Sequence, residues 1–264
     1  MSARRLRGAA LVAASAAALA TGVLWCTGPL AAAAGTRARA AAAGPAVQVM
    51  IVGAGNLVLS GPRSVPAAQA TVRTGGRTCG VAAGTPLAAL ADLHELGGPA
   101  FAIRDYGHCT SSPRASGQLF VYSLDGETNH GQNGWEYKVD NLSGTTGAGD
   151  PTGPQGDGRL LARGARVLWF WCQAFAGGCQ RTLALSAPRT VARGAAVQVR
   201  VTGYDNYGRG TGMPGARVRL AGDSAVSGGS GVLTLRAPSR AGSYTLSASR
   251  PGSVPAFPET LAVR

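Results

Sequence analysis

Lysine, acidic residues and histidine are scarce in this chain, and each shortage narrows the possible functions. The 264 residues include 25 basic and 12 acidic side chains, and Lys138 is the single lysine. Arginine in place of lysine, beside 40 glycines and abundant alanine, is what a GC-rich genome produces. The arginines are scattered along the chain, whereas a nucleic-acid binder clusters its basic residues on one face. We therefore expect no nucleic-acid partner.

Recognisable catalytic motifs are also missing. The sequence holds no serine nucleophile elbow, no His-Glu-x-x-His, no phosphate-binding loop and no dinucleotide fingerprint at a strand–helix junction. The three histidines are His94, His108 and His130. A carboxylate pair for glycoside hydrolysis is the alternative, because Glu127, Glu136 and Asp140 are close in sequence. We expect a protein that is not an enzyme and uses no cofactor.

Long apolar runs are missing beyond the first 40 residues. Arg4, Arg5 and Arg7 precede an apolar stretch over 8–25, and alanine-rich sites for a signal peptidase follow. This pattern predicts a signal peptide over residues 1–40, with an uncleaved membrane anchor as the alternative. Cleavage removes five arginines and no acid, so the formal net charge falls from +13 by five, to +8. We expect a secreted or cell-surface protein.

Four cysteines remain after cleavage, and an even number in an exported chain predicts two disulfides. Three pairings are possible, and we favour Cys79–Cys109 and Cys172–Cys179 because each closes a local loop. Loop-closure entropy gives about 3.7 and about 2.5 kcal/mol for these loops. A zinc site that also uses His108 is the alternative. Since no Cys-x-x-Cys spacing occurs, we expect no metal site.

The N-terminal half predicts one helix among strands, after a linker over residues 41–46. Thr85 suits a helix N-cap, Pro86 suits the first helical position, and Gly97-Gly98 ends the helix. Residues 56–66 read as a connecting stretch. Strands are expected at 47–52, 70–73, 101–105, 119–124, 135–139, 166–171 and 181–185. The pattern predicts an α+β domain over residues 47–187.

Beyond Pro188 the chain lacks cysteine, tryptophan and any helical period. Most short segments there alternate with period two and are bounded by Gly, Pro, Asn or Asp. They cover residues 197–202, 216–220, 231–236, 242–249 and 259–263. Short strands at such spacing predict an all-β second domain, a β-sandwich over residues 189–264.

Aromatic residues are concentrated in two of the expected strands. Alternation places Trp135 and Tyr137 on one face of the first, and Trp169 and Trp171 on one face of the second. If the strands pair, the rings meet across them. Two interpretations stay open: the rings are core, or they present a surface to a flat ligand, a glycan or a polymer.

Two further features flank these aromatics in the binding hypothesis. Tyr106 lies beside Cys109 and is a candidate ligand contact, although a structural role for this segment is the alternative. Loop 144–158 is unusually long for a compact domain and is a candidate flank for a ligand. Its two carboxylates, Asp150 and Asp157, do not have the spacing of an EF-hand calcium loop.

Four segments follow one another in a recognisable order: a helix at 84–90, a strand ending in glycine at 119–126, Trp-Glu-Tyr-Lys-Val-Asp within 134–141, and a turn and aromatic strand at 163–170. With these segments, residues 47–187 resemble the transcobalamin C-terminal-like domain, a β-grasp-like module of bacterial secreted and surface proteins, which has Trp-x-Tyr-x-Val-Asn at the third segment. Asp140 stands where the family has asparagine. In transcobalamins this domain covers one side of bound cobalamin. Residues 189–264 resemble a bacterial Ig-like domain.

Together these features predict an exported, non-enzymatic binding module that presents an aromatic surface to an unidentified ligand. The alternative is a structural or cell-surface protein-interaction module whose partner is an envelope or surface protein. Contact with a membrane is expected only through an uncleaved leader. The candidate ligand contacts are Trp135, Tyr137, Trp169, Trp171 and Tyr106.

Overall fold

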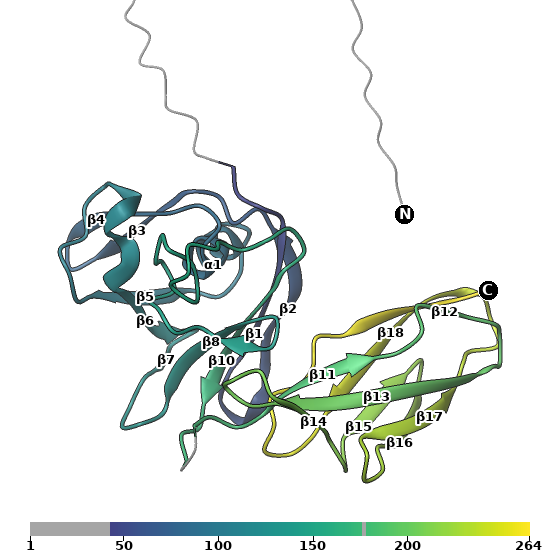
Figure 1. Ribbon diagram of the computed structural model, residues 1–264. Coiled ribbons are helices and arrows are strands. Elements are labelled where there is room, and N and C mark those ends of the chain that lie inside the picture. The colour runs from purple at the N-terminus through teal and green to yellow at the C-terminus, as the bar shows by residue number, and fades with distance from the viewer. Residues whose placement is uncertain (1–42, 176–177) are drawn as a thin grey trace, which may run out of the picture. The chain divides into compact units, whose positions relative to one another are not determined.

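Strands dominate the architecture and are arranged in several sheets, so the fold is mainly β (Figure 1). The structure is a computed structural model and describes residues 43–175 and 178–264. The expected signal peptide, residues 1–40, lies outside the described residues. Within those described, no helix has the length and apolar character needed to cross a bilayer.

The first sheet is mixed and has the strand order β2-β1-β10-β8-β9. Strands β1 and β10 are parallel at its centre, and the other neighbours are antiparallel. Its strands are β1 (Val47–Val52), β2 (Val58–Val65), β8 (Gly134–Val139), β9 (Leu142–Ser143) and β10 (Arg166–Cys172). A parallel central pair needs cover on both faces.

Strand β2 corrects the sequence prediction, which made residues 56–66 a connecting stretch. Gly61 and Pro62 favour a break in a central strand, but β2 lies at the edge of its sheet. At an edge a proline needs no partner for the hydrogen bond that it cannot donate. The register with β1 also shifts beside these two residues, so the ladder accommodates them.

Helix α1 (Pro86–Glu95) begins and ends as the sequence predicts. The Thr85 hydroxyl accepts a hydrogen bond from the backbone N–H of Ala88 at 3.2 Å. Gly97 has φ of +80°, the left-handed conformation that glycine adopts at little cost after a helix. The buried face of α1 joins the core that lies on one side of the first sheet.

Two smaller sheets complete this part of the chain, with strand orders β3-β4 and β5-β6-β7. Their strands are β3 (Ala70–Thr74), β4 (Arg77–Val81), β5 (Phe101–Asp105), β6 (Leu119–Leu124) and β7 (Glu127–Thr128). Two short 3-10 helices are η1 (Ala54–Asn56) and η2 (Pro113–Gln118). The β6–β7 turn contains Asp125 and Gly126, both at positive φ, as expected of a tight hairpin.

The C-terminal part consists of two sheets that share one apolar core. One contains β11 (Thr182–Ser186), β13 (Ala196–Tyr204), β14 (Gly210–Gly212) and β17 (Val232–Arg236). The other has the order β12 (Thr190–Val191), β19 (Glu259–Val263), β18 (Gly242–Ser249), β15 (Arg217–Leu220) and β16 (Asp223–Val226). Strand β11, expected as the last strand of the N-terminal domain, pairs instead with β13.

Strand β10 is buried on both faces. Val167, Trp169 and Trp171 face the core that contains α1. Leu168, Phe170 and Cys172 face a second cluster, which includes Val254 and Phe257 from the C-terminal part. Residues far apart in sequence therefore cover the two faces of one strand, and the described residues form a single compact unit.

Both expected disulfides are present. Cys79 is bonded to Cys109, 30 residues away, and Cys172 to Cys179, seven residues away. The first joins β4 to the segment after β5, and the second closes a short turn after β10. Each bond crosslinks the chain locally, as the spacing predicts.

The two disulfides should differ in their contribution to stability. Replacing Cys79 and Cys109 with serine is expected to lower the free energy of unfolding by about 3.7 kcal/mol, against about 2.5 kcal/mol for Cys172 and Cys179, because the larger loop gains more entropy when released. Urea unfolding of the two oxidised double variants measures the difference. A larger loss for the seven-residue loop would contradict this expectation.

Candidate functional site

The four aromatic residues singled out in the sequence lie on two paired strands. Strands β8 and β10 are antiparallel, and Trp169 lies opposite Tyr137 while Trp171 lies opposite Trp135. The ring centroids are 5.4 Å apart in the first pair and 5.7 Å apart, edge to face, in the second. The expected cross-strand aromatic contacts are therefore present.

All four of these side chains are buried, with exposed fractions between 1% and 6%. They face the core shared with α1 rather than solvent. The indole N–H of Trp135 donates to the carbonyl of Glu127 at 2.8 Å, and the Tyr137 hydroxyl donates to that of Thr146 at 2.9 Å. Their burial favours the core interpretation of these four residues over direct contact with a ligand, although Trp135 also lines a hollow beside segment 129–136.

Loop 144–158 provides part of that cover. A Cβ at Gly144 would lie about 2.0 Å from the Tyr137 ring, so only glycine permits this close approach. The carbonyl of Ala148 accepts a hydrogen bond from the backbone of Leu87 at 2.8 Å, at the start of α1. The loop is therefore bound to the core of the first part and shields Tyr137.

The carboxylates of this loop serve its own turns. Asp150 accepts hydrogen bonds from the backbone N–H and the hydroxyl of Thr152, at 2.8 and 2.6 Å. Asp157 forms an ion pair with Arg159 at 3.6 Å. These contacts are the local side-chain turns that aspartate favours in loops.

Tyr106 differs from the other four predicted contacts, because its side chain is 66% exposed. Its ring centroid lies 6.0 Å from that of Phe120, and the guanidinium of Arg104 lies 4.7 Å from the centre of the Tyr122 ring. Arg104 and Phe120 are direct partners across β5 and β6. We call these four residues, Arg104, Tyr106, Phe120 and Tyr122, the aromatic face.

Alternation along β6 was the available signal for this face. Leu119 and Val121 are buried in the core, whereas Phe120 and Tyr122 point the other way. The same period of two places Arg104 outward on β5. Both strands were predicted, but their solvent-facing residues were not among the predicted contacts, and three of the four members were therefore missed.

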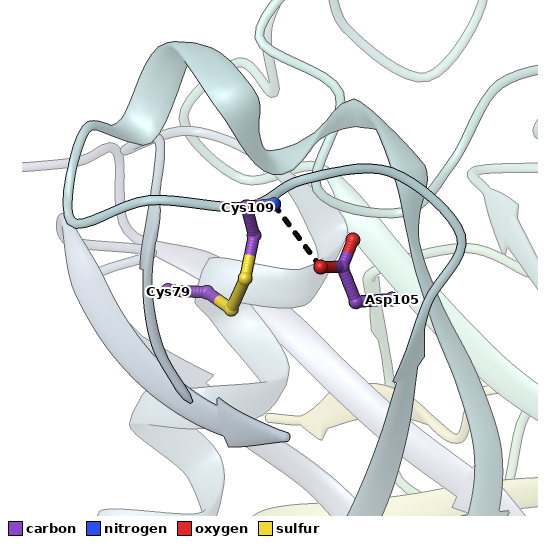
Figure 2. Close-up of side chains that lie close together, drawn as sticks. All are labelled: Cys79, Asp105 and Cys109. Atoms are coloured by element: carbon purple, nitrogen blue, oxygen red, sulfur yellow. Dashed lines mark hydrogen bonds between the residues drawn. A yellow bond between two sulfur atoms is a disulfide. The ribbon is translucent and has the colours of Figure 1, made fainter. Parts of the chain in front are cut away.

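The segment that carries Tyr106 is held rigidly by Asp105 and a disulfide. Figure 2 shows Asp105 accepting a hydrogen bond from the backbone N–H of Cys109, at 3.0 Å. The other carboxylate oxygen accepts a hydrogen bond from the backbone N–H of Gly107 at 3.0 Å. The Arg77 guanidinium lies 3.7 Å from the oxygen that accepts from Cys109. Cys79, Asp105 and Cys109 lie close enough together for metal ligands, but the two sulfurs are bonded to each other. This cluster therefore does not fit a metal and instead fixes the loop that presents Tyr106.

The aromatic face forms a ridge between two hollows. One hollow extends to the β3–β4 turn and is lined there by Thr74, Gly75 and Arg77. The other extends to segment 129–136, including Asn129, His130 and Glu136. Both share Arg104, Tyr106 and Tyr122. A ligand could thus contact aromatic rings, an arginine and polar side chains at once.

Of the three carboxylates considered for glycoside hydrolysis, Glu136 lines a hollow beside the aromatic face, and Glu127 and Asp140 do not. The Glu127 carboxylate accepts from the backbone of Ala54 at 2.9 Å, and Asp140 accepts from the backbone of Arg166 at 3.1 Å. Glu136 is the one carboxylate that lines the hollow beside segment 129–136, and desolvation by the surrounding protein raises its pKa. Glycoside hydrolysis needs two cooperating carboxyl groups, and this hollow offers one.

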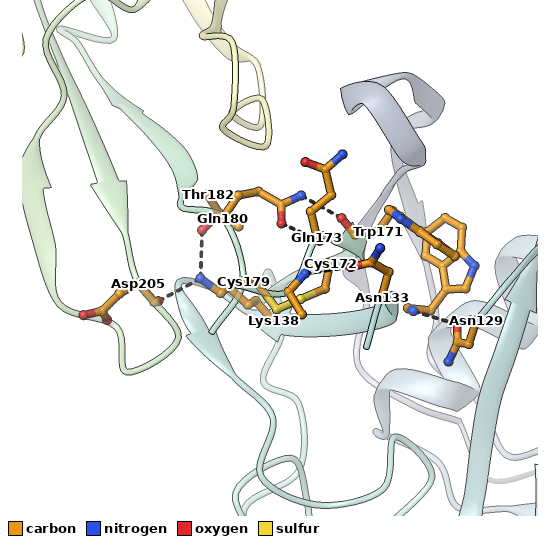
Figure 3. Close-up of a disulfide and its surroundings, with 12 residues drawn as sticks. Asn129, Asn133, Lys138, Trp171, Cys172, Gln173, Cys179, Gln180, Thr182 and Asp205 are labelled. Carbon is orange, nitrogen blue, oxygen red and sulfur yellow. Dashed lines mark hydrogen bonds between the residues drawn. A yellow bond between two sulfur atoms is a disulfide. The ribbon is translucent and has the colours of Figure 1, made fainter. Parts of the chain in front are cut away.

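Lys138 occupies a second unusual environment, on the face of β8 opposite Trp135 and Tyr137. It is fully buried, and its ammonium donates to the carbonyl of Asp205 at 2.7 Å and to the Thr182 hydroxyl at 3.1 Å (Figure 3). The carbonyl of Tyr204 is a third acceptor, at 3.3 Å. Desolvation lowers the pKa of Lys138 to about 8, although the Asp205 carboxylate opposes the shift. The single lysine therefore bonds the first sheet to the C-terminal part.

Comparison of this chain with protein-family models, with curated proteins and with solved structures finds no match.

Burial of the tryptophans predicts their fluorescence. In a chain that lacks residues 1–40, and hence Trp25, the emission of Trp135, Trp169 and Trp171 should be blue-shifted and weakly quenched by iodide, because water does not reach their rings. Stern–Volmer titration measures this, with a urea-unfolded sample as the control. Quenching in the folded chain as strong as in urea would contradict the buried arrangement.

Lys138 should make the protein more stable as the pH rises from 8 to 10. Its pKa of about 8 in the folded state lies below the unfolded value of 10.5, so the unfolded chain binds more protons in this window. Relative to a Lys138→Met variant, the free energy of unfolding should rise by about 2 kcal/mol. Urea unfolding of both proteins at pH 8, 9 and 10 measures the rise.

Tyr137 should reverse the rise in stability above pH 10. Burial raises the pKa of Tyr137 to about 12, so the folded state holds a proton that the unfolded chain loses above pH 10. Stability should consequently fall between pH 10 and 12 in both proteins. The Lys138 prediction concerns the lower window. If the free energies of unfolding of Lys138→Met and of the unmodified chain differ by the same amount at pH 8, 9 and 10, the role assigned to Lys138 is refuted.

Proposed function

We propose that this chain is an exported, non-enzymatic binding module whose ligand surface is the aromatic face. The observation that carries the proposal is the pairing of Tyr106 with Phe120 and of Arg104 with Tyr122 on one solvent-facing sheet surface. Exposed aromatic rings beside a cation suit a flat or sugar-like ligand, because rings stack and the arginine supplies charge and hydrogen bonds.

Preorganisation is the second support for binding at this surface. Asp105, its backbone hydrogen bonds and the Cys79–Cys109 bond hold the Tyr106 segment in place before any ligand arrives. A surface fixed in advance loses little conformational entropy on binding. Such rigid support is typical of binding sites carried on loops.

The resemblance to the transcobalamin C-terminal-like domain is part of the same proposal. A helix packed on a mixed sheet, with β1 parallel to β10 at the centre and a hairpin on each side, supports a β-grasp-like first domain. Two sheets around one core support an Ig-like second domain. Two disulfides are compatible with export to an oxidising compartment.

A protein-interaction module is the second candidate, and a different hollow favours it. Leu142, Leu160 and Tyr207 line it with exposed fractions of 38%, 44% and 73%. Neighbouring exposed apolar side chains of this size commonly mark contact surfaces for other proteins. In this alternative the aromatic face carries no small ligand.

The test is a binding panel of cobalamins, haem and glycans, measured by calorimetry on the oxidised protein. For a compound that binds, Tyr106→Ala or Phe120→Ala should weaken affinity by about 5- to 30-fold, as truncation of an aromatic anchor does. Both side chains are exposed, so the melting temperature should stay close to that of the unmodified protein.

Tyr207→Ala is the matched control, because it removes an equally exposed tyrosine from the other hollow. It should leave affinity for the panel compound unchanged. If Tyr207→Ala weakens binding and Tyr106→Ala does not, the ligand lies in the second hollow and the proposed surface is wrong.

A further inference from the structure

The positive charge of the described chain lies almost wholly in its C-terminal part. Residues 43–180 carry nine basic and nine acidic side chains, so their formal charges cancel. Residues 181–264 carry eleven arginines and three acids, a surplus of eight. A GC-rich genome explains arginine in place of lysine throughout the chain. It does not explain why the acids balance the basic residues in one part and are heavily outnumbered in the other.

The described arginines of the C-terminal part form no close ion pairs. None of the eleven lies within ion-pair distance of a carboxylate among the residues described. Glu259 instead pairs with Arg166 of the first part at 2.6 Å, and Asp205 accepts hydrogen bonds from the backbone of Arg209 and Tyr207. The surplus is therefore available to an external anion.

Three of these arginines converge at one end of the two C-terminal sheets. Arg193 lies in the turn between β12 and β13, Arg236 ends β17, and Arg240 lies in the connection to β18. The backbone of Gly194 donates to the carbonyl of Pro238 at 3.2 Å, which joins the turn to the connection. We call Arg193, Arg236 and Arg240 the arginine end; β12, beside the chain end marked C in Figure 1, leads into it.

The side chains at the arginine end are exposed, and the loops that carry them meet. The Arg236 guanidinium lies 3.9 Å from the position that a Cβ on Gly194 would take, directly beside Arg193. All three arginines are exposed. The aspartate and glutamate side chains of residues 181–264 lie in other segments: Asp205 after β13, Asp223 at the start of β16 and Glu259 at the start of β19. The backbone of Arg193 donates to the carbonyl of Arg264, the last residue of the sequence, at 3.1 Å.

We propose that the arginine end binds a linear anionic polysaccharide. Guanidinium groups bind carboxylate, sulfate and phosphate through paired hydrogen bonds, and three groups on neighbouring loops match the repeated charges of such a polymer. This surface is distinct from the aromatic face, and the inference does not depend on the proposed function.

Two other anionic partners fit this end less well. The exposed large hydrophobic side chains of residues 181–264 are Tyr207 and Val226, and neither belongs to the arginine end. Apolar side chains that enter a bilayer strengthen binding to an anionic membrane. Aromatic rings that stack on bases strengthen binding to single-stranded nucleic acid. Tyr244 also lies at this end, where its hydroxyl donates to the carbonyl of Arg240 at 3.0 Å, but its side chain is half-buried. An interaction dominated by charge and hydrogen bonds favours a polysaccharide.

The test uses the full chain as secreted by an expressing host, with heparin and polygalacturonate as probes and dextran as the uncharged control. The unmodified protein should bind both anionic polymers and not dextran. Replacing Arg193, Arg236 and Arg240 with serine should weaken binding by at least tenfold. It should also reduce the slope of log Kd against log salt by about two to three, one for each lost contact.

The matched control replaces Arg63, Arg73 and Arg163 with serine. These arginines are also exposed, so the variant loses the same charge from the first part of the chain. It should bind heparin within about twofold of the unmodified protein. Equal weakening by both triple variants would show that net charge alone drives binding and would overturn the proposal.

Vesicles of anionic lipid and single-stranded DNA complete the panel. Binding to either one at least tenfold tighter than to both polysaccharides, and lost in the Arg193/Arg236/Arg240 variant, would overturn the choice of polymer. No binding to either polysaccharide at low salt would overturn the site itself. Circular dichroism of each triple variant verifies that a loss of binding is not a loss of folding.

Discussion

Burial of β10 on both faces is the constraint on which the remaining structure depends. Its run of apolar residues needs one cover for Val167, Trp169 and Trp171 and another for Leu168 and Phe170. Helix α1 and loop 144–158 contribute to the first cover, and residues of the C-terminal part provide the second. Both faces of the first sheet are therefore covered only when both parts of the chain are present. Loop 144–158 contributes to the core as well as to the surface.

Local signals predicted most elements, because they depend on neighbouring residues. The cap at Thr85, the glycine after α1 and the alternation in β18 and β19 each specify an element within a few positions. Strand β2 and the partner of β11 could not be predicted in the same way. The glycine and proline of β2 are tolerated because β2 lies at the edge of its sheet, which the sequence does not show. The sheet that β11 joins depends on long-range pairing with β13.

The binding surface was harder to predict than the fold for a physical reason. Large aromatic residues such as Trp169 and Trp171 fit a buried strand and an exposed one equally well, and the sequence does not state which face is covered. Tyr106 was predicted from its place beside a cysteine, while Phe120 and Tyr122 needed the alternation of β6 to be followed outward. The uneven charge was visible in the sequence, but its convergence at Arg193, Arg236 and Arg240 depends on which loops meet.

Lys138 gives the protein an unusual relation to proteases. An endoprotease that cleaves only after lysine has a single target in the whole chain, and that target lies fully buried near the end of β8. Cleavage there requires β8 to leave its sheet and the C-terminal part to release the ammonium group. The rate of one cut, giving two fragments, would therefore report how often the two parts of the molecule separate in otherwise native conditions.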